Sequence, residues 1–306
     1  MVIRVAIIGM GKIARDQHVP SIRNDPRFDL VATVSPNGRM EGVTAYRDLE
    51  DLIAAGGVDA VAICTPPDIR HGLARRAIEA GWHVMLEKPP AATVALAEDI
   101  GVQARAAGVT AFATWHSREA AAVDVARDWL RGKKIDRIRI SWRENIREWH
   151  PGQDWLMTEA GFGVFDPAIN AFSILTKLVP GAVATESATL MIPANREAPI
   201  AADLRFRTAG GVPVEVDLDF LESGRQVWTI AIATDAGECT LYDGGARFVT
   251  PEGEVEVESA GEYPRLYARF ADLIAAGETD VDATPLAMVS DALRLGTRRV
   301  AASFDF

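Results

Sequence analysis

Residues 2–14 read "VIRVAIIGMGKIA", and this stretch decides the fold of the N-terminal part. An almost unbroken apolar run leads into "GMGKIA", which has the pattern G-x-G-x-x-A. Between a strand and a helix, such glycines allow a tight turn and a close approach to a pyrophosphate, which the free N–H groups of the helix then bind. We therefore predict a dinucleotide site at Gly9 and Gly11, with Lys12 and Ile13 at the start of the helix.

Apolar runs of the same kind recur up to about residue 117. They read "DLVATVS", "VDAVAIC", "HVMLEK" and "TAFATW", and helical segments such as "DIRHGLARRAIEAG" separate them. A continuously apolar strand is buried on both faces, which is typical of a parallel sheet covered by helices. The pattern predicts a doubly wound, parallel Rossmann sheet in residues 1–118.

After Ser117 the strands alternate between apolar and polar residues. The clearest examples are "IRISWR" at 138–143 and "VPVEVDLDF" at 212–220. Alternation indicates a mainly antiparallel sheet with one packed face and one face that is wet or available to a second copy of the chain. We predict an α/β domain over residues 119–306, closed by two helices near 263–276 and 285–302, and a homo-oligomer through its sheet.

The composition excludes several classes of partner. The chain has 306 residues, 48% of them hydrophobic and 25% charged, and a net charge of −11, which disfavours binding to nucleic acid. Cys64 and Cys239 are too few and too far apart for a disulfide framework or a zinc site. Because no apolar run is long enough to cross a membrane and no signal-like segment opens the sequence, we expect a cytoplasmic protein.

The end of the second strand bears on the choice between NAD and NADP. An acidic residue there would bind the adenosine ribose of NAD, but this sequence reads "TVSPNGR" and offers Ser35, Asn37 and Arg39. We therefore predict NAD or NADP without a preference. Thr65 and Pro66 fall at the carboxyl edge of the same sheet and are further candidate contacts of the cofactor.

His71 lies just inside the helix that follows Thr65 and Pro66. We expect this residue to be structural or to contact the cofactor, and we do not expect it to be catalytic.

The stretch "HVMLEKPPAAT", residues 83–93, ends a buried strand with Glu87 and Lys88. In a doubly wound sheet both lie at the edge where ligands bind, so we predict that both contact the cofactor and that Lys88 takes part in proton transfer. The alternative is an ion pair with a purely structural role at a strand end.

The second domain contains a candidate site in "GFGVFDPAIN", residues 161–170. The spacing of Asp166 and Asn170 places both on one face of a helix. Asp166 also fits the role of an N-cap, since Pro167 follows it.

A second group of candidates surrounds "SWRENIREWHPGQDW", residues 141–155, which holds three of the seven tryptophans. Indole faces beside hydrogen-bonding groups suit a sugar, so Glu144, Trp149 and His150 are candidate sugar contacts, and "TWHSRE" adds His116. Packing of some of these tryptophans in the core is the alternative.

Together, "GMGKIARDQHVP", "CTPP", "GWHVMLEKPPAAT" and "GFGVFDPAIN" resemble the Gfo/Idh/MocA family of NAD(P)-dependent oxidoreductases. The resemblance implies a Rossmann domain followed by an α/β domain with a large open sheet. The segments "KIARDQH", "FATWHSR", "WHPGQDW" and "FDPAIN" are more similar still to its branch of L-arabinose and D-galactose 1-dehydrogenases.

Two positions depart from the family pattern. Many members carry histidine where this chain has Asn170, and asparagine cannot exchange a proton usefully. The acid/base role then falls to Asp166 or Lys88, and Asn170 would orient a hydroxyl. Pro36 stands where the branch can carry an arginine that favours NADP.

The resemblance implies oxidation of an aldopyranose, L-arabinose or D-galactose, at C1 to the aldonolactone. Lys88, Asp166 and Asn170 would be catalytic, no metal would be needed, and His116, Glu144, Trp149 and His150 would position the sugar together with Asp166 and Asn170. One alternative is a dehydrogenase of another sugar or an inositol at a ring carbon. Others are a non-enzymatic sensor of sugar or NAD(P), and a domain that serves only assembly.

Overall fold

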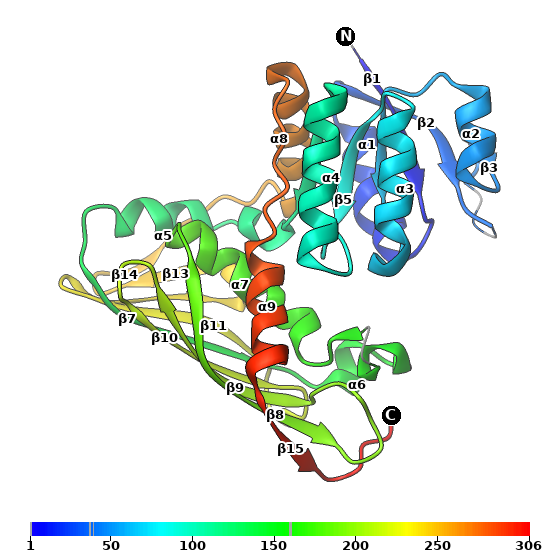
Figure 1. Ribbon diagram of the computed structural model, residues 1–306. Coiled ribbons are helices and arrows are strands. Elements are labelled where there is room, and N and C mark those ends of the chain that lie inside the picture. Colours follow the sequence, from blue (N-terminus) through cyan, green and yellow to red (C-terminus); the bar gives the residue numbers. More distant parts are fainter. Residues whose placement is uncertain (1, 37, 39, 159–160) are drawn as a thin grey trace. The chain divides into compact units, whose positions relative to one another are not determined.

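The computed structural model describes residues 2–36, 38, 40–158 and 161–306. The chain divides into two compact units. The first contains residues 1–116 and 260–283, and the second contains residues 117–259 and 284–306. Each unit is built around its own sheet (Figure 1).

The first unit contains a parallel sheet of six strands in the order β3-β2-β1-β4-β5-β6. The strands are β1 (Ile3–Ile8), β2 (Phe28–Val34), β3 (Thr44–Tyr46), β4 (Ala60–Ile63), β5 (His83–Glu87) and β6 (Ala111–Thr114). The order reverses between β1 and β4, as in a doubly wound Rossmann sheet, so the sheet predicted from the apolar runs is confirmed.

Helices cover both faces of this sheet and bury a separate hydrophobic cluster on each. The helical elements are η1 (Ala14–His18), α1 (Val19–Asn24), α2 (Leu49–Ala55), α3 (Pro67–Glu79), α4 (Val94–Ala107) and α8 (Glu262–Ala276). Tyr263, Leu266 and Phe270 of α8 pack in the same cluster as Val5 of β1. The single boundary expected at residue 118 therefore differs from the structure, because the apolar face of α8 packs on the first sheet.

The second unit contains a nine-stranded sheet in the order β14-β13-β12-β11-β7-β10-β9-β8-β15. Its strands are β7 (Ile135–Arg143), β8 (Val183–Pro193), β9 (Ala201–Thr208), β10 (Pro213–Asp219), β11 (Val227–Thr234), β12 (Gly237–Tyr242), β13 (Arg247–Thr250), β14 (Gly253–Val255) and β15 (Thr297–Ala301). Only the pairs β7–β10 and β8–β15 are parallel among the pairings of the described residues. The predicted open, mainly antiparallel sheet is therefore confirmed.

One face of the second sheet is covered by helices. They include α5 (Val123–Leu130), α7 (Phe165–Leu178) and α9 (Thr284–Leu295), while η2 (His116–Glu119), α6 (Ile146–Trp149), η3 (Asp154–Met157) and η5 (Asp243–Gly245) are shorter. The apolar residues of the alternating strands, such as Ile138, Ile140 and Val216, are buried on this covered face.

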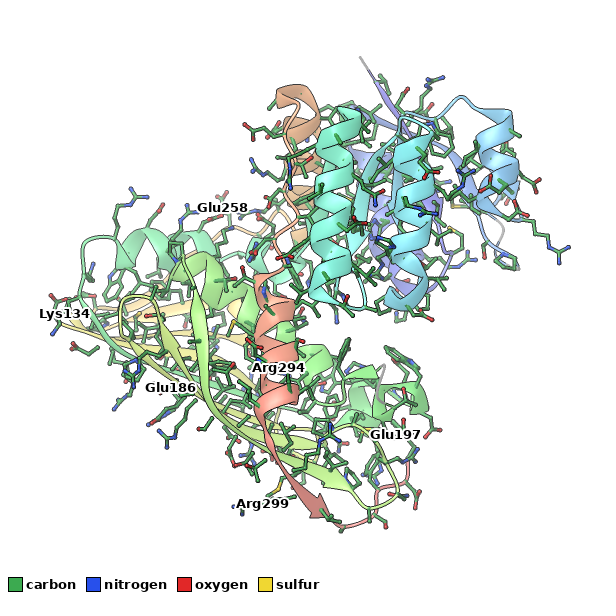
Figure 2. The ribbon with its side chains drawn as sticks, viewed as in Figure 1. Lys134, Glu186, Glu197, Glu258, Arg294 and Arg299 are labelled. Atoms are coloured by element: carbon green, nitrogen blue, oxygen red, sulfur yellow. The ribbon has the colours of Figure 1, made fainter. Side chains whose placement is uncertain are left out.

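The opposite face of the second sheet is charged. Arg139 and Arg205 both contact Glu215 there, and Glu186, labelled in Figure 2, forms an ion pair with Arg207. The apolar residues of the alternating strands thus belong to the packed side, and the uncovered side carries both signs of charge.

The C-terminal helix is shorter than expected. The periodicity favoured a helix over 285–302, but α9 ends at Leu295 and β15 follows it. Gly296 allows the change, since a Cβ there would lie 2.6 Å from the carbonyl oxygen of Ala292. In the described part of the chain, no helix is sufficiently long and apolar to span a membrane.

Candidate active site

The glycine turn after β1 lies where the order of the first sheet reverses. Gly9 has φ +94°, a conformation that favours glycine, and a Cβ there would lie 3.0 Å from backbone atoms of Cys64 and Thr65. The backbone N–H of Cys64 donates to the carbonyl oxygen of Ile8 at 2.8 Å. The carboxyl ends of β1 and β4 therefore form the crevice edge at which open α/β sheets bind ligands.

The groups around this turn fit a dinucleotide. A Cβ at Gly11 would meet no atom within 4 Å, so the space beside the helix start is open to a ligand. Within the described residues, the buried hydroxyl oxygen of Thr65 has no hydrogen-bond partner, and a cofactor hydroxyl or amide would supply one. Gly9, Gly11 and Thr65 thus fit a dinucleotide, and their contact with the cofactor stays a prediction.

The other predicted cofactor contacts differ in their surroundings. Lys12 is exposed and pairs with Asp16, and Ile13 and Pro66 are also exposed. The hydroxyl of Ser35 accepts a hydrogen bond from the backbone N–H of Gly38 at 3.0 Å.

His71 is half-buried, and its Nε2 lies 2.7 Å from Asp99 of α4. This contact links α3 to α4, and contact of His71 with the cofactor stays a prediction. Asn37 and Arg39 lie outside the described residues.

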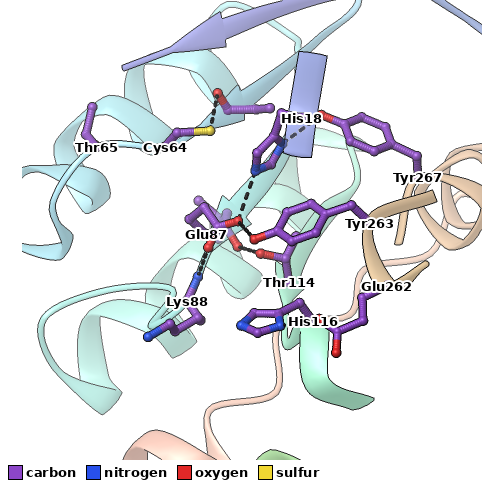
Figure 3. A network of polar contacts seen from close by, with 12 residues as sticks. His18, Cys64, Thr65, Glu87, Lys88, Thr114, His116, Glu262, Tyr263 and Tyr267 are labelled. Carbon is purple, nitrogen blue, oxygen red and sulfur yellow. Dashed lines mark hydrogen bonds and ion pairs between the residues drawn. The ribbon is translucent and has the colours of Figure 1, made fainter. Parts of the chain in front are cut away.

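Glu87, the last residue of β5, is only 5% exposed and lies at the centre of a polar network (Figure 3). Its Oε1 lies 2.9 Å from Nε2 of His18 and 2.7 Å from the hydroxyl of Tyr263. Its Oε2 accepts a hydrogen bond from the backbone N–H of Lys88 at 3.0 Å. Nδ1 of His18 in turn lies 2.8 Å from the hydroxyl of Tyr267. The side chain of Lys88 is half-buried beside this network.

The network holds a buried ion pair. Burial alone would lower the pKa of His18, but Cys64, Tyr267 and the hydrogen bond to Glu87 raise it well above the usual value of 6.5. Burial alone would raise the pKa of Glu87, but the hydrogen bond and the charge of His18 lower it to about 2. Burial and the charge of Glu87 raise the pKa of the Tyr263 hydroxyl, which therefore acts as a donor.

His116 lies beside the same network. Its Nδ1 is 2.6 Å from Oε2 of Glu262, and its ring stacks on Tyr263 with the ring centroids 5.9 Å apart. Both partners are on α8, so this helix orients His116 from a distant part of the sequence.

In the second unit, Asp166 and Asn170 are half-buried on α7. The helix begins at Phe165 with Val164 as its N-cap, so the alternative in which Asp166 is only an N-cap is wrong. The preceding turn is tightly packed, since a Cβ on Gly163 would lie 2.1 Å from the carbonyl oxygen of Pro199. This packing fixes the start of α7 and with it the position of Asp166.

A second polar group in this unit is centred on Glu144, which is 2% exposed. Its Oε1 lies 3.0 Å from Nε2 of His150, and its Oε2 accepts from Nε1 of Trp228 at 2.8 Å. Trp149 is 42% exposed, and its ring centroid is 4.9 Å from that of Trp228. Trp142 also stacks on Trp228, with the ring centroids 6.1 Å apart.

The structure thus places the candidates in three groups. Lys88, Glu87 and His116 belong to the first unit, together with the glycine turn. Asp166 and Asn170 share one helix of the second unit, and Glu144, Trp149 and His150 form one cluster there.

Sequence reasoning missed His18, Tyr263 and Trp228 as parts of these groups. Trp228 pairs with Trp142 across neighbouring strands, and a search for aligned tryptophans in alternating strands would have found it. His18 ends the segment "KIARDQH", but nothing in that segment shows that its ring contacts Glu87, and no local pattern marks Tyr263. Among the described residues, no cluster of three or more metal-ligating side chains occurs.

Residues 3–114 match GFO_IDH_MocA, an oxidoreductase family with an NAD-binding Rossmann fold. Over 97% of its length the chain is 38% identical to the galactose 1-dehydrogenase of Pseudomonas fluorescens, and the match covers 96% of that relative. The chain belongs to this oxidoreductase family. The predicted family, the enzyme class and a nicotinamide dinucleotide as cofactor are confirmed.

Two solved structures extend the comparison with this family. The D-galactose-1-dehydrogenase of Rhizobium etli is 45% identical, with a TM-score of 0.96 over 99% of this chain and 98% of that one. The WlbA dehydrogenase of Bordetella pertussis, solved with NADH and UDP-GlcNAcA, has a TM-score of 0.82 over 96% of both chains. At 21% identity, this second likeness shows a shared fold alone.

Proposed function

We propose that this family member oxidises an aldopyranose, D-galactose or L-arabinose, at C1 to the aldonolactone. The observation that carries the proposal is the similarity over the whole chain to two galactose dehydrogenases, at 38% and 45% identity. Polar groups gathered beside exposed or half-buried indole rings in the second unit also suit a sugar.

The glycine turn, the start of the following helix and Thr65 would hold the dinucleotide. Backbone N–H groups at Gly11 and Lys12 would face its pyrophosphate, and Ser35 would face the adenosine ribose. When bound, NAD or NADP supplies the hydride acceptor at C4 of its nicotinamide ring.

Lys88 and Asp166 would handle the proton of the anomeric hydroxyl. Loss of that proton and of a hydride from C1 converts the sugar to its lactone, so one residue must accept the proton as the C1–O bond becomes a carbonyl. A lysine ammonium also stabilises negative charge that develops on the oxygen. Asn170, one helical turn after Asp166, would orient a neighbouring hydroxyl.

His116, Glu144, Trp149 and His150 would position the sugar. Glu144 accepts hydrogen bonds from His150 and Trp228, which fixes the two rings against each other. The exposed face of Trp149 suits the CH patch of a pyranose. L-arabinose and D-galactose share the configuration of their ring hydroxyls and differ by a hydroxymethyl group at C5, so one pocket can accept both.

The test is an absorbance assay for reduced nicotinamide with the purified chain. NAD and NADP are each combined with L-arabinose, D-galactose, D-xylose, D-glucose and myo-inositol. We expect turnover with the first two sugars. Comparison of the rates with NAD and with NADP shows which cofactor the protein prefers. Oxidation of inositol alone, or turnover with none of these pairs, would refute the proposal.

A second assay separates the roles of the two proton-transfer candidates. Asp166→Ala and Lys88→Ala should each lower kcat by about two orders of magnitude or more, since each removes a group that acts in the transition state. The variant of the general base alone should lose the acidic limb of the pH–rate profile of kcat. An unchanged kcat in either variant removes that residue from the mechanism.

We further propose that two copies of the chain associate through the uncovered face of the second sheet. The face contains a shallow depression of about 280 Å³, lined by residues of both charges that include Arg139, Arg205, Asp203 and Asp217. Such a mixture can be self-complementary across a two-fold axis. Light scattering after gel filtration tests this, and a monomer at micromolar concentration would reject it. A cytoplasmic location stays a prediction, which cell fractionation tests.

A further inference from the structure

Two buried side chains, Glu87 and Arg70, hold the backbone around Lys88. Its N–H donates to Oε2 of Glu87 at 3.0 Å. The guanidinium of Arg70, which is 3% exposed, donates to the carbonyl oxygens of Glu87 and Pro89, the two residues that flank Lys88. Arg70 also donates to the carbonyl oxygen of Thr65. The same guanidinium therefore ties the lysine loop to the carboxyl end of β4.

Hydrogen bonds to both of its oxygens fix the carboxylate of Glu87. Oε1 accepts from His18 and from Tyr263, and Oε2 accepts from the backbone of Lys88. Figure 3 shows the carboxylate between these groups, with Tyr263 approaching from α8. Both oxygens of Glu87 thus face donors of the protein, which argues for an indirect role and against direct contact with the cofactor.

A buried ion pair contributes little net free energy to the stability of a fold. The desolvation of two charges costs roughly as much free energy as their attraction returns. Apolar side chains of similar volume in the place of the pair often stabilise a protein equally well or better. A carboxylate with several buried donors does, however, define one position for the groups bonded to it. Here the group bonded to it is the backbone of Lys88.

We propose that Glu87 and Arg70 are positioning residues for Lys88, and that Tyr263 and His18 act on the lysine through Glu87. This inference rests on the proposed function, because it assumes that Lys88 acts on the substrate. It also gives α8 a role in the active site, although this helix lies about 170 residues after Lys88 in the chain.

The experiment compares two hydroxyl deletions on the same helix. Tyr263→Phe removes the donor to Glu87, whereas Tyr267→Phe removes a buried hydroxyl whose partner in the network is His18. We expect Tyr263→Phe to lower kcat about tenfold, with KM for sugar and Kd for the dinucleotide within about twofold of wild type. Tyr267→Phe, whose hydroxyl reaches Glu87 through His18, should have a smaller effect: we expect kcat to fall by no more than about threefold, with KM and Kd within about twofold of wild type.

Glu87→Gln provides a second variant in case Tyr263→Phe does not fold. The amide keeps the shape of the carboxylate but cannot accept hydrogen bonds on both sides, so the fall in kcat should be larger, about a hundredfold. Equal losses in Tyr263→Phe and Tyr267→Phe would overturn the proposal, because they would reflect general loosening of α8.

A second readout does not depend on sugar turnover. The full chain is labelled with trinitrobenzenesulfonate without sugar, and the rate at Lys88 is compared by mass spectrometry with that at Lys134, whose side chain is 78% exposed. If the backbone around Lys88 is less firmly held, Lys88 should be labelled about threefold faster in Tyr263→Phe and Glu87→Gln than in wild type. We do not expect this increase in Tyr267→Phe.

The two readouts separate the two proposals. If the wild type oxidises no sugar but the labelling changes as expected, the proposed function fails and the positioning role stands. If sugars are oxidised but neither kcat nor labelling responds to Tyr263→Phe or Glu87→Gln, the positioning role is rejected and the proposed function stands.

Discussion

The buried pair of His18 and Glu87 predicts a specific dependence of stability on pH. The perturbation is His18→Gln, which keeps a side-chain nitrogen near the place of Nε2 but removes the charge. Deleting one partner of a buried ion pair leaves the other uncompensated, which typically costs about 3–5 kcal/mol. We therefore expect the free energy of unfolding of the variant at about pH 7 to be roughly 3 kcal/mol below that of wild type.

The sign of the pH effect follows from the raised pKa of His18. A group with a raised folded-state pKa binds a proton in the folded state that the unfolded state has already lost above its usual pKa of 6.5. Its contribution is complete below that value and is lost as the pH rises toward the folded-state pKa. The slope reaches at most about 1.4 kcal/mol for each pH unit, so wild type should lose stability relative to the variant as the pH rises from about 7 to about 8.5.

The assay is urea-induced unfolding, followed by circular dichroism at several pH values in this range. Groups that titrate in both proteins contribute equally, so the difference between wild type and His18→Gln isolates His18. We expect this difference to shrink toward the alkaline end. Parallel curves, with a constant difference at every pH, would refute the protonated state of His18 and the ion pair with Glu87.

Three further predictions concern the site and the turn before α7. Lys88→Ala should lower kcat by about two orders of magnitude or more while dinucleotide binding, measured by fluorescence titration, changes little; retained turnover would contradict its catalytic role. Trp149→Ala should raise KM for sugar about tenfold, and Trp155→Ala, which removes another exposed tryptophan, should not; equal effects would return Trp149 to a packing role. Gly163→Ala should lower the free energy of unfolding by about 2 kcal/mol or more, because the added Cβ would meet a carbonyl oxygen. Gly152→Ala, at φ +68° with open space around it, should lower it by about 1 kcal/mol. Thermal melts in which Gly152→Ala is the less stable variant would contradict this ranking.

Much of the fold follows from local patterns. Continuous apolar runs predicted the parallel sheet, and alternation predicted the mainly antiparallel one, because burial on two faces and burial on one face leave different periods in a strand. The exception at the C-terminus shows the limit of periodicity. Residues 297–301 pair with β8 as an edge strand although their sequence continued a helical pattern.

The candidate residues divide in the same way. Gly9, Gly11, Lys88, Asp166 and Asn170 are recognisable because each belongs to a short motif whose spacing has a physical reason, a tight turn, a strand end or one face of a helix. Their roles in the reaction are proposals that the kinetic assays test.

The sequence by itself determined the two sheets, the dinucleotide turn and the resemblance to an oxidoreductase family, because each depends on residues close together in the chain. Only the tertiary structure decided which distant groups complete them. The return of α8 to the first sheet brings Tyr263 to Glu87, and strand pairing brings Trp228 to Glu144. Such contacts depend on which apolar surfaces pack together, and that choice is made by the whole chain and leaves no local pattern in the sequence.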